Sequence, residues 1–234
     1  MIKMKNTNLT AIILCGGKGL RLRPLTNDIP KPLIPINKTP MLGIIIDHLK
    51  SYEINNFMIT TGYKSEKIDS FMKSYSELIN YKTINSGDVD ILSRIKDAIK
   101  NFNNDFILCY GDTISDINID DLVSFHEKHP EDIIISSYKV KLPFGIMEID
   151  QSDNVSSFKE KPILDAEMNI GYYYFPKSSF KNINKGEDIV SLLQEFIQLK
   201  KLKCFKHDGV HITINTLAEL ETAKNNLSEI TSKD

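Results

Sequence analysis

The segment of the chain best suited to chemistry is a glycine-rich turn followed by positively charged side chains. Residues 11–35 read AIILCGGKGLRLRPLTNDIPKPLIP, so a short apolar run leads directly into the turn. The residues that define the pattern are Gly16, Gly17, Gly19, Arg21, Arg23 and Lys31. Glycines let the backbone approach a ligand closely, so that successive N–H groups can point at one anion. The pattern predicts a site for the polyphosphate of a nucleotide, and the alternative is an ordinary turn after a strand.

Arginine usage favours the anion site over the ordinary turn. The chain contains three arginines among 29 basic residues, and two of them, Arg21 and Arg23, lie in this segment. Arginine offers a planar pair of donors that matches a phosphate group, whereas lysine acts as a point charge. The spacing is neither G-x-x-x-x-G-K-[ST] nor G-x-G-x-x-G, so the segment is not one of the two common phosphate loops.

A carboxylate at the end of an apolar run is the second candidate. Residues 106–112 read FILCYGD, in which the run ends in Gly111 and then Asp112. Mg²⁺ prefers oxygen ligands and usually takes one or two carboxylates together with substrate phosphates. Asp112 is therefore a candidate Mg²⁺ ligand, and the alternative is that it caps a turn or a helix.

The first half of the chain alternates strand-like and helix-like segments, and these elements must position both candidates. The expected strands are Thr10–Leu14, Asn56–Thr61, Tyr81–Ile84 and Asp105–Cys109. The expected helices are Met41–Tyr52, Ser65–Tyr75, Leu92–Phe102 and Ile119–His126. This order predicts a Rossmann-like α/β fold with a doubly wound, mainly parallel (mixed) sheet. Ligands of such sheets bind at the carboxyl ends of the strands, where Gly16–Gly19 and Gly111–Asp112 are expected.

The second half of the chain is richer in short strand-like runs. These runs are Asp132–Val140, Gly145–Asp150, Val155–Phe158 and Tyr172–Phe175, and helices are expected at Glu187–Lys200 and Thr216–Leu227. No repeat or linker divides the chain, so we expect residues 1–234 to form a single domain whose second half extends the same sheet. The polar residues Thr231–Asp234 are expected to be frayed.

Composition excludes some classes of function. The 234 residues carry a net charge of −2, which gives no general attraction to nucleic acid or to anionic lipid. There is no signal-peptide pattern and no apolar run of membrane-spanning length, so we expect a cytoplasmic protein that binds no membrane. Cys15, Cys109 and Cys204 are widely spaced in apolar stretches and are expected to be reduced and buried, although Cys15 could also act in the loop.

The glycine-rich segment is similar to the signature of a known enzyme family. Its pattern G-G-x-G-x-R-L-x-P-L-T, followed by P-K-P-L, resembles that of the sugar-1-phosphate nucleotidylyltransferases. The resemblance implies that the loop wraps a nucleoside triphosphate and that Arg21 and Lys31 contact its phosphates. Leu20 stands where the family most often has threonine. The nucleotide-binding residues implied in this way are Leu14, Gly16, Gly17, Gly19, Arg21, Lys31, Asn85, Gly87, Tyr110 and Gly111.

The resemblance also implies a Mg²⁺ site and a sugar-phosphate site. Asp112 would be the principal metal ligand and Asn215 the second, where the family usually has aspartate. Asn215 could instead be the N-cap of the helix that starts near Thr216. The E-K-P element and its neighbours would bind the sugar 1-phosphate through Gly145, Glu160, Lys161, Asn169 and Gly171. Residues 1–130 would then be the nucleotide-binding half and residues 131–234 the sugar-phosphate-binding half.

The loop that selects the base departs from the family patterns. Residues 84–98 read INSGDVDILSRIKDA and resemble glucose-1-phosphate cytidylyltransferases, except that Leu92 and Ser93 replace a pair of glycines. CTP is therefore the favoured nucleotide. The runner-up is GTP with a mannose- or heptose-type 1-phosphate, and UTP or dTTP follows. A phosphate that is not a sugar phosphate is an alternative for the acceptor. Arg94 could contact phosphate or could simply be a charge on the surface of a helix.

The family mechanism implies that catalysis depends on positioning and charge neutralisation. A sugar-phosphate oxygen would attack the α-phosphorus in line, Arg21 and Lys31 would stabilise the leaving pyrophosphate, and Lys161 would hold the attacking phosphate. Asn215, Leu92 and Ser93 keep open a second class, a non-catalytic regulatory homologue. Homo-oligomers are common in the family, so a homo-oligomer is allowed here. A nucleic-acid-binding module is excluded by the charge balance.

Overall fold

The computed structural model describes the backbone of residues 6–231, and all of their side chains except those of residue 7 and of residues 226–231. Of the segment expected to be frayed, residues 232–234 lie outside the described residues, and Thr231 is the last residue of a helix. Over the described part of the chain, no helix combines the length and the apolar character needed to cross a membrane.

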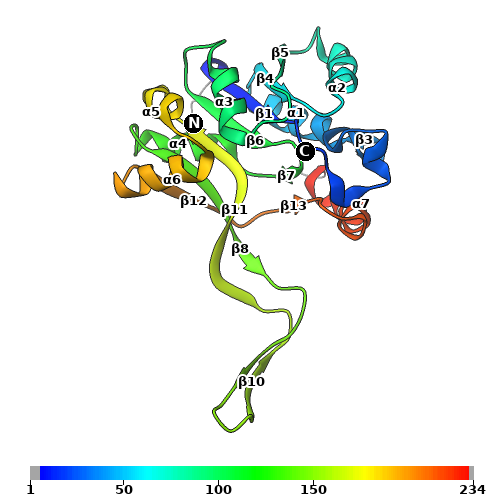
Figure 1. Ribbon diagram of the computed structural model, residues 1–234, viewed down its shortest axis with the longest axis vertical. Coiled ribbons are helices and arrows are strands. Elements are labelled where there is room, and N and C mark those ends of the chain that lie inside the picture. The colour runs from blue at the N-terminus through cyan, green and yellow to red at the C-terminus, as the bar shows by residue number, and fades with distance from the viewer. Residues whose placement is uncertain (1–5, 232–234) are drawn as a thin grey trace.

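A seven-stranded sheet forms the centre of the molecule (Figure 1). Its strands, in spatial order, are β12 (Leu202–His207), β8 (Ile133–Lys141), β11 (Ile163–Phe175), β6 (Phe106–Tyr110), β1 (Thr10–Leu14), β4 (Asn56–Thr61) and β5 (Asn80–Asn85). β11 is antiparallel to both of its neighbours, and the other adjacent pairs are parallel. The expected mainly parallel, mixed sheet is therefore confirmed, and strands of the second half extend it.

Helices cover both faces of the sheet. One face packs against α1 (Met41–Ser51), α2 (Ser65–Met72), α4 (Ile119–Glu127) and α7 (Leu217–Thr231). The other face packs against α3 (Ile91–Ile99), α5 (Phe180–Lys185) and α6 (Ile189–Gln198). Single-turn 3₁₀ helices lie at Asn6–Asn8, Leu20–Leu22, Leu25–Asn27, Lys31–Leu33, Lys73–Tyr75 and Lys177–Ser179.

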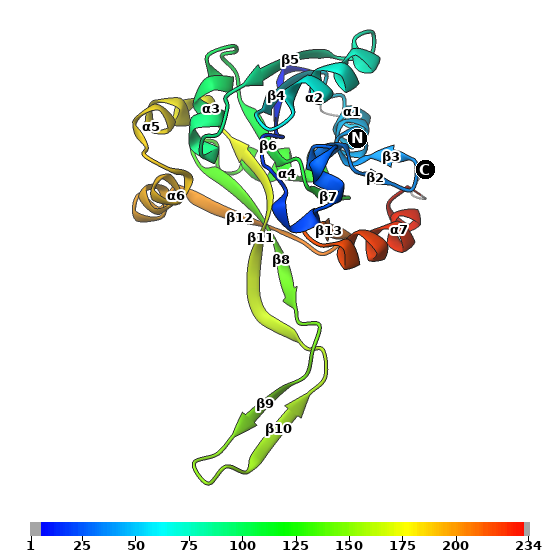
Figure 2. The same ribbon diagram turned by 45° about the vertical axis from the view of Figure 1, so that its right-hand side comes forward.

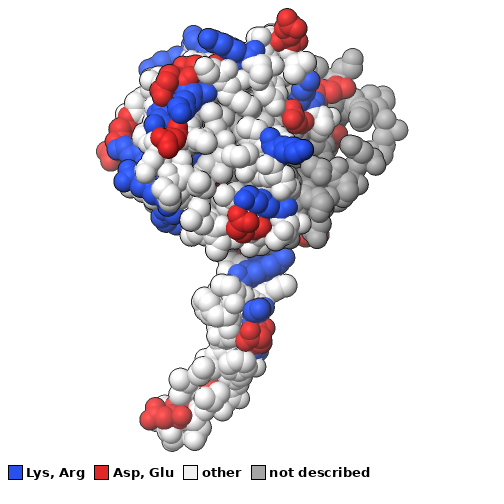
Figure 3. Space-filling view, turned by 90° about the vertical axis from the view of Figure 1, so that its right-hand side faces the viewer, with Lys and Arg blue, Asp and Glu red and all other residues white. Residues whose placement is uncertain are grey.

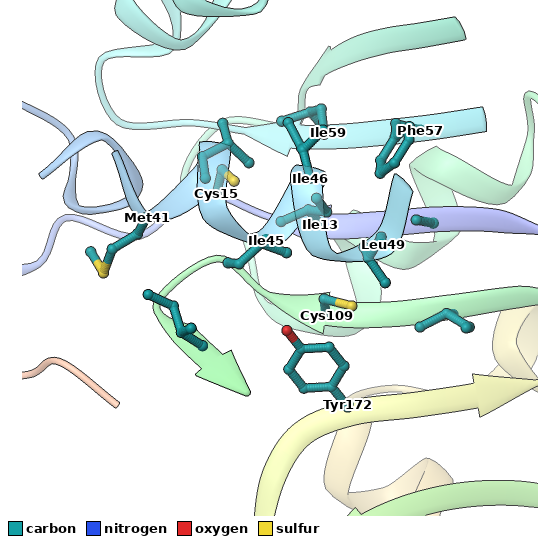
Figure 4. Close-up of a cluster of buried hydrophobic side chains, with 14 of the residues drawn as sticks. Ile13, Cys15, Met41, Ile45, Ile46, Leu49, Phe57, Ile59, Cys109 and Tyr172 are labelled. Atoms are coloured by element: carbon teal, nitrogen blue, oxygen red, sulfur yellow. The ribbon is translucent and has the colours of Figure 1, made fainter. Parts of the chain in front are cut away.

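Alternation along the strands explains why the central runs are apolar throughout. Ala11 and Ile13 of β1 point into one core, and Ile12 points into the other. Both faces are buried, as expected for parallel strands covered by helices on each side. Figure 4 shows part of the core beneath α1, where Ile13, Phe57 and their neighbours meet the helix.

The cysteines do not all lie where the sequence predicts. Cys15 and Cys109 are buried in the core beneath α1, but Cys204 is exposed, so its expected burial is wrong. Cys204 lies on β12, which is an edge strand of the sheet and carries two lysines, Lys203 and Lys206, among its apolar residues. Its thiol donates to the Ser137 hydroxyl at 3.0 Å.

The chain order reverses between β1 and β6. The first crossover leads from β1 to β4, whereas β6 pairs on the opposite side of β1. Such a switch point opens a crevice at the carboxyl ends of the two strands, here at Leu14 and Tyr110. Short strands complete this edge: β2 (Pro35–Ile36) pairs with β3 (Thr39–Pro40), and β7 (Thr113–Ser115) pairs with β13 (His211–Thr213).

A two-stranded arm projects from the same edge (Figures 1 and 2). β8 and β11 run past the body of the sheet and continue into the antiparallel ribbon of β9 (Ile146–Ile149) and β10 (Val155–Lys159). The ribbon is a separate two-stranded sheet, and its side chains belong to neither core.

Candidate active site

Two adjoining cavities lie at the carboxyl ends of β1 and β6. The first, of about 380 Å³, is lined by Gly19, Leu20, Arg21, Leu22, Lys31, Asp112 and Asn215. The second, of about 300 Å³, is lined by Leu14, Gly16, Gly17, Lys31, Pro32, Asp88, Val89, Asp90, Ile91, Arg94, Tyr110, Gly111 and Asp112. Lys31 and Asp112 line both cavities, so the glycine turn and the candidate metal ligand belong to one continuous crevice.

The ammonium group of Lys31 lies at the centre of this crevice. Its Nζ is 2.5 Å from Oδ2 of Asp112 and donates to Oδ1 of Asn215 at 3.0 Å. Lys31 is only 9% exposed, because it begins a short 3₁₀ turn that is fixed by Pro30 and Pro32. A buried cation between two oxygen-bearing side chains is well placed to meet a phosphate that enters the crevice.

Asn215 faces the crevice and does not cap the following helix. Arg21 also donates to its Oδ1, at 2.9 Å, so a single amide oxygen accepts from two cationic side chains. The N-cap is Thr216, whose hydroxyl accepts from the Glu219 N–H at 3.2 Å, while the Glu219 carboxylate accepts from the Thr216 N–H. This is a capping box, so the N-cap alternative for Asn215 is wrong.

The glycine turn is shaped by contacts that a side chain would block. Gly19 has φ +61°, a left-handed conformation, and a Cβ there would lie 2.9 Å from the Thr26 methyl and 3.1 Å from the Lys31 Cβ. A Cβ on Gly17, in contrast, would meet no atom within 4 Å, so the backbone there borders open space. Gly19 therefore fixes the turn, and Gly17 leaves room for a ligand.

Arg94 is buried and holds three loop segments together. Its guanidinium donates to the carbonyl oxygens of Thr61 at 2.6 Å, Gly87 at 2.7 Å and Gly16 at 3.5 Å. Arg94 is 6% exposed, and a Cβ on Gly16 would fall within 2.6 Å of the guanidinium. The expected alternative of a charge on the helix surface is therefore wrong, because Arg94 is buried and ties the glycine turn to the ends of β4 and β5. Arg94 also lines the second cavity, so a phosphate contact stays a prediction. Arg23 is exposed and lines neither cavity.

The loop expected to select the base lies across the second cavity from the glycine turn. Lys18 of the turn forms an ion pair with Asp88 at 2.6 Å. Asp90 accepts from the Ser93 N–H at 3.0 Å and caps α3, while Leu92 is fully buried in the core. The two residues that replace the family's glycines therefore start a helix.

Asn85 and Gly87 support this loop and do not line either cavity. Asn85 accepts from the Gly87 N–H at 3.0 Å and donates to the Ser65 hydroxyl at 3.1 Å. Gly87 has φ +72°, which turns the chain back toward α3.

One part of the expected sugar site adjoins the crevice. Gly171 has φ +75°, and a Cβ there would lie 2.7 Å from the ring of Tyr110, which lines the second cavity. Asn169 accepts from the Gly171 N–H at 2.9 Å and donates to the hydroxyl of Tyr173. The Tyr173 and Tyr110 hydroxyls are in turn 3.3 Å apart.

The other part of the expected sugar site lies on the arm. Glu160 and Lys161 form the turn between β10 and β11, and Gly145 lies beneath the ring of Phe158. Within the described residues, no hydrogen bond or ion pair joins Glu160 or Lys161 to either cavity. At a rise of about 3.3 Å per residue, the extended segment from Lys161 to Gly171 spans up to roughly 30 Å.

The donors at Asp112 and Asn215 fit a hard divalent cation. Their oxygens both contact one cation, the Lys31 ammonium, so they face the same point in the crevice. In the described part of the chain, no group of three or more His, Cys, Asp or Glu side chains is placed to bind a metal. The remaining ligands of a Mg²⁺ ion would therefore be water and phosphate oxygens, as is usual for this ion.

Cys15 follows β1 at this edge but is not suited to reaction. Burial raises the pKa of its thiol far above the ordinary value, and the charge of Asp112 raises it further. A protonated, buried thiol is a poor nucleophile and a poor metal ligand.

Comparison with known proteins agrees with this arrangement. The family model described as "Nucleotidyl transferase" matches residues 10–208. A probable glucose-1-phosphate cytidylyltransferase of Bacillus subtilis is 29% identical over 91% of this chain and 93% of its own length. A D-glycero-alpha-D-manno-heptose 1-phosphate guanylyltransferase of Campylobacter jejuni is 34% identical over 83% of this chain and 88% of its own.

Solved structures agree on the fold. A putative glucose-1-phosphate thymidylyltransferase of Bacillus anthracis superposes with a TM-score of 0.77 at 22% identity, over 94% of this chain and 95% of its own. The sheet order, the glycine turn and the matched residues 10–208 lead to one conclusion: the chain belongs to the nucleotidyl transferase family.

Proposed function

We propose that this protein transfers a nucleotidyl group from a nucleoside triphosphate, with CTP favoured, to a sugar 1-phosphate. The observation that carries the proposal is the convergence of Arg21 and Lys31 with Asp112 and Asn215 in one crevice beside the glycine turn. Family membership and the relatives, which are named as sugar-1-phosphate nucleotidyltransferases, support the reaction class.

The reaction needs no protein nucleophile. An oxygen of the sugar 1-phosphate forms a bond to the α-phosphorus, the bond from that phosphorus to the oxygen bridging to the β-phosphorus breaks, and pyrophosphate leaves. Because the attacking oxygen is already anionic, the protein mainly aligns the two substrates and offsets their negative charge.

The crevice residues take roles that follow from their positions. The backbone at Gly16 and Gly17 would cradle the triphosphate, and Arg21 and Lys31 would donate to the departing pyrophosphate. Asp112 and Asn215 would hold Mg²⁺, which when bound supplies positive charge that offsets the phosphates. On phosphate entry, the Lys31 ammonium would exchange its contact with Asp112 for one with a phosphate oxygen.

The sugar 1-phosphate would occupy the side of the crevice nearest β11. Asn169 and Gly171 lie next to Tyr110, which supports a role in binding the sugar. Glu160, Lys161 and Gly145 would contribute only when the arm bends back so that its turn reaches the crevice. Residues 1–130 would then serve mainly the nucleotide and residues 131–234 mainly the sugar phosphate, within one domain that acts in the cytoplasm.

CTP is favoured because the segment 84–98 resembles that of cytidylyltransferases and because one relative is named as such a protein. GTP with a mannose- or heptose-type 1-phosphate is the specific alternative, since another relative is named as a heptose 1-phosphate guanylyltransferase.

The test is a matrix of four nucleoside triphosphates against a panel of sugar 1-phosphates, read by pyrophosphate release with Mg²⁺ present. We expect release with CTP and at least one hexose 1-phosphate. A clear preference for GTP would overturn the base assignment and leave the reaction class intact. Nucleotide binding without release from any pair would instead indicate a regulatory homologue.

A further inference from the structure

We propose that Tyr173 is a positioning residue that sets the direction of the Tyr110 hydroxyl group, so that Tyr110 donates a hydrogen bond to the sugar 1-phosphate. Tyr110 ends β6 and lines the second cavity, whereas Tyr173 lies on β11 and is buried. The inference rests on the function proposed above, because it assigns a substrate to the Tyr110 hydroxyl.

A bulge in β11 shapes the contact with Tyr110. From Asn169 to Tyr173, β11 advances four residues, while the paired residues of β8 are only two apart. Extra residues in one strand of a pair form a β-bulge, which redirects the side chains around it. Gly171 lies within this bulge at φ +75°, and a Cβ there would overlap the Tyr110 ring. The ring therefore packs directly against the backbone of β11.

The Asn169 side chain gives the hydrogen bonds at this bulge a direction. Its Oδ1 accepts from the Gly171 N–H at 2.9 Å, so the amide oxygen faces the backbone and Nδ2 faces the Tyr173 hydroxyl. An amide nitrogen can only donate, so the oxygen of Tyr173 must accept from it. The proton of Tyr173 is then available for another acceptor.

That acceptor is the hydroxyl oxygen of Tyr110, which is 3.3 Å from the hydroxyl oxygen of Tyr173. Burial and the neighbouring Tyr110 raise the pKa of Tyr173 above its ordinary value, so Tyr173 keeps its proton at neutral pH. Because Tyr173 donates to Tyr110, the proton of Tyr110 is left for an oxygen that enters the second cavity. The 3.3 Å separation is long for two hydroxyls, but donation by Tyr110 to a ligand strengthens the bond behind it, since linked hydrogen bonds polarise one another.

The position of β6 indicates which substrate receives this proton. β6 lies between β1, which leads into the glycine turn, and β11, which carries Asn169 and Gly171. The Tyr110 ring contacts β11, so its hydroxyl lies on the side of the crevice proposed for the sugar 1-phosphate. A phosphate oxygen is an anionic acceptor and gains most from such a donor.

The charge distribution makes local donors important for holding a phosphate. On the side of the molecule drawn in Figure 3, basic and acidic side chains are interspersed over the body. The net charge of the whole chain is −2. A surface of mixed sign produces no broad positive field to attract an anion, so binding depends on the donors within the crevice.

Steady-state kinetics of pyrophosphate release test the proposal, with the wild-type chain, Tyr110→Phe, Tyr173→Phe and the double variant. We expect Tyr110→Phe to lower kcat/KM for the sugar 1-phosphate at least ~10-fold, the scale of one hydrogen bond to a charged group. Tyr173→Phe keeps the Tyr110 hydroxyl but removes the group that directs it, so we expect a loss of about three- to tenfold. The KM for the nucleoside triphosphate should change little in either variant.

The double variant distinguishes positioning from an independent effect. If Tyr173 acts through Tyr110, the loss of both hydroxyls should cost no more than the loss of the Tyr110 hydroxyl alone. Losses that multiply in the double variant would show that Tyr173 acts independently of Tyr110 and would overturn the positioning role. Wild-type kinetics in Tyr173→Phe would overturn it as well.

Tyr174→Phe is the matched control. Tyr174 is the next residue of β11, but its hydroxyl donates at 2.7 Å to Asp105, which precedes β6 at the opposite edge of the sheet. We expect its kinetics to match the wild type, and a loss equal to that of Tyr173→Phe would indicate a general loosening of β11 and contradict the proposal. A wild-type chain that releases pyrophosphate with no substrate pair would overturn the proposed reaction and this inference together. Normal release by the wild type and by Tyr173→Phe would overturn this inference alone.

Discussion

At the scale of single residues, the crevice depends on where a few cations lie relative to oxygen atoms. Lys31 and Arg21 share the amide oxygen of Asn215, and Lys31 also pairs with Asp112. Asparagine offers a metal an oxygen but no formal charge. In the proposed reaction, the protein would therefore depend on the nucleotide's own phosphates to complete the charge around Mg²⁺.

The variant Asn215→Asp tests this charge argument. A carboxylate at residue 215 would add a negative charge beside Asp112. It should lower the Mg²⁺ concentration for half-maximal activity by about threefold or more, because charge attraction strengthens at short range. Calorimetric titration of Mg²⁺ without nucleotide provides a second readout, in which binding should become tighter. Unchanged metal affinity in both measurements would remove Asn215 from the metal site.

Arg94 should act by positioning the glycine turn. The variant Arg94→Lys keeps the charge, but its single ammonium cannot bridge the carbonyls of Thr61, Gly16 and Gly87. We expect the KM for the nucleoside triphosphate to rise at least ~10-fold, since small displacements of a binding loop are costly. The KM for the sugar 1-phosphate should change little.

Arg23→Lys is the control for this experiment, because Arg23 is exposed and lines neither cavity. We expect it to leave both KM values unchanged. Equal effects of Arg94→Lys on the two KM values would indicate a general loss of structure and would argue against a positioning role.

At the scale of elements, strands and helix ends deliver these side chains to one edge of the sheet. The start of α7 is an example, because the Glu219 carboxylate accepts from the N–H groups of both Asn215 and Thr216. The capping box therefore orders the residue that faces the crevice as well as the helix that follows it.

The variant Glu219→Ala should lower both stability and activity. Loss of a helix cap typically costs about 0.5–2 kcal/mol, which is measurable by denaturant unfolding. Glu221→Ala is the matched control, since Glu221 makes only an exposed pair with Lys224 that is worth a few tenths of a kcal/mol at most. If the two variants unfold alike, the capping box makes no special contribution.

Sequence patterns predicted the elements with continuous apolar runs well. Thr10–Leu14 and Asn56–Thr61 are strands with the expected bounds, because each buries both faces between helices. β12 was not predicted, since two lysines interrupt its short apolar stretch, which lies on an edge strand. For β11 only the last four residues were predicted, because the preceding part runs along the exposed arm, where no core imposes a pattern.

The sequence predicted the site residues that belong to a local motif. It missed those whose role depends on a contact between residues far apart in the chain. The glycine turn and Lys31 are recognisable from one segment. The hydrogen bond from Arg94 to Gly16 joins residues 78 apart, and no local pattern encodes it. The D-x-x-S pattern at Asp90 could have indicated that α3 starts there, so that Leu92 and Ser93 belong to its first turn.

At the scale of the whole molecule, buried histidines make stability depend on pH. Burial lowers the pKa of His211 to about 4, and the neighbouring His207 acts in the same direction. An unfolded histidine titrates near 6.5, so between about pH 6.5 and pH 4 the unfolded chain binds the proton more readily than the folded chain. The stability that comes from keeping His211 neutral is present above about pH 6.5 and is lost as the pH falls toward 4.

Thermal unfolding measured at several pH values checks this dependence. We expect the Tm of the wild-type chain to fall between pH 6.5 and pH 4.5, and the fall to be shallower in His211→Gln. For each chain, the change in Tm is calculated from that chain's own Tm at pH 7.5. A loss of packing in the variant then does not affect the comparison. Parallel curves for the two chains would show that His211 does not contribute.

The central claim is that the crevice around Asp112 and Lys31 carries out nucleotidyl transfer. The most direct measurement is kcat for pyrophosphate release by the wild-type chain and by Asp112→Ala, with CTP, Mg²⁺ and the best sugar 1-phosphate. We predict that the variant folds as the wild type does and that its kcat is at least ~10²-fold lower, the scale of losing one preorganised charge-stabilising group. Near-normal turnover in Asp112→Ala would contradict the account.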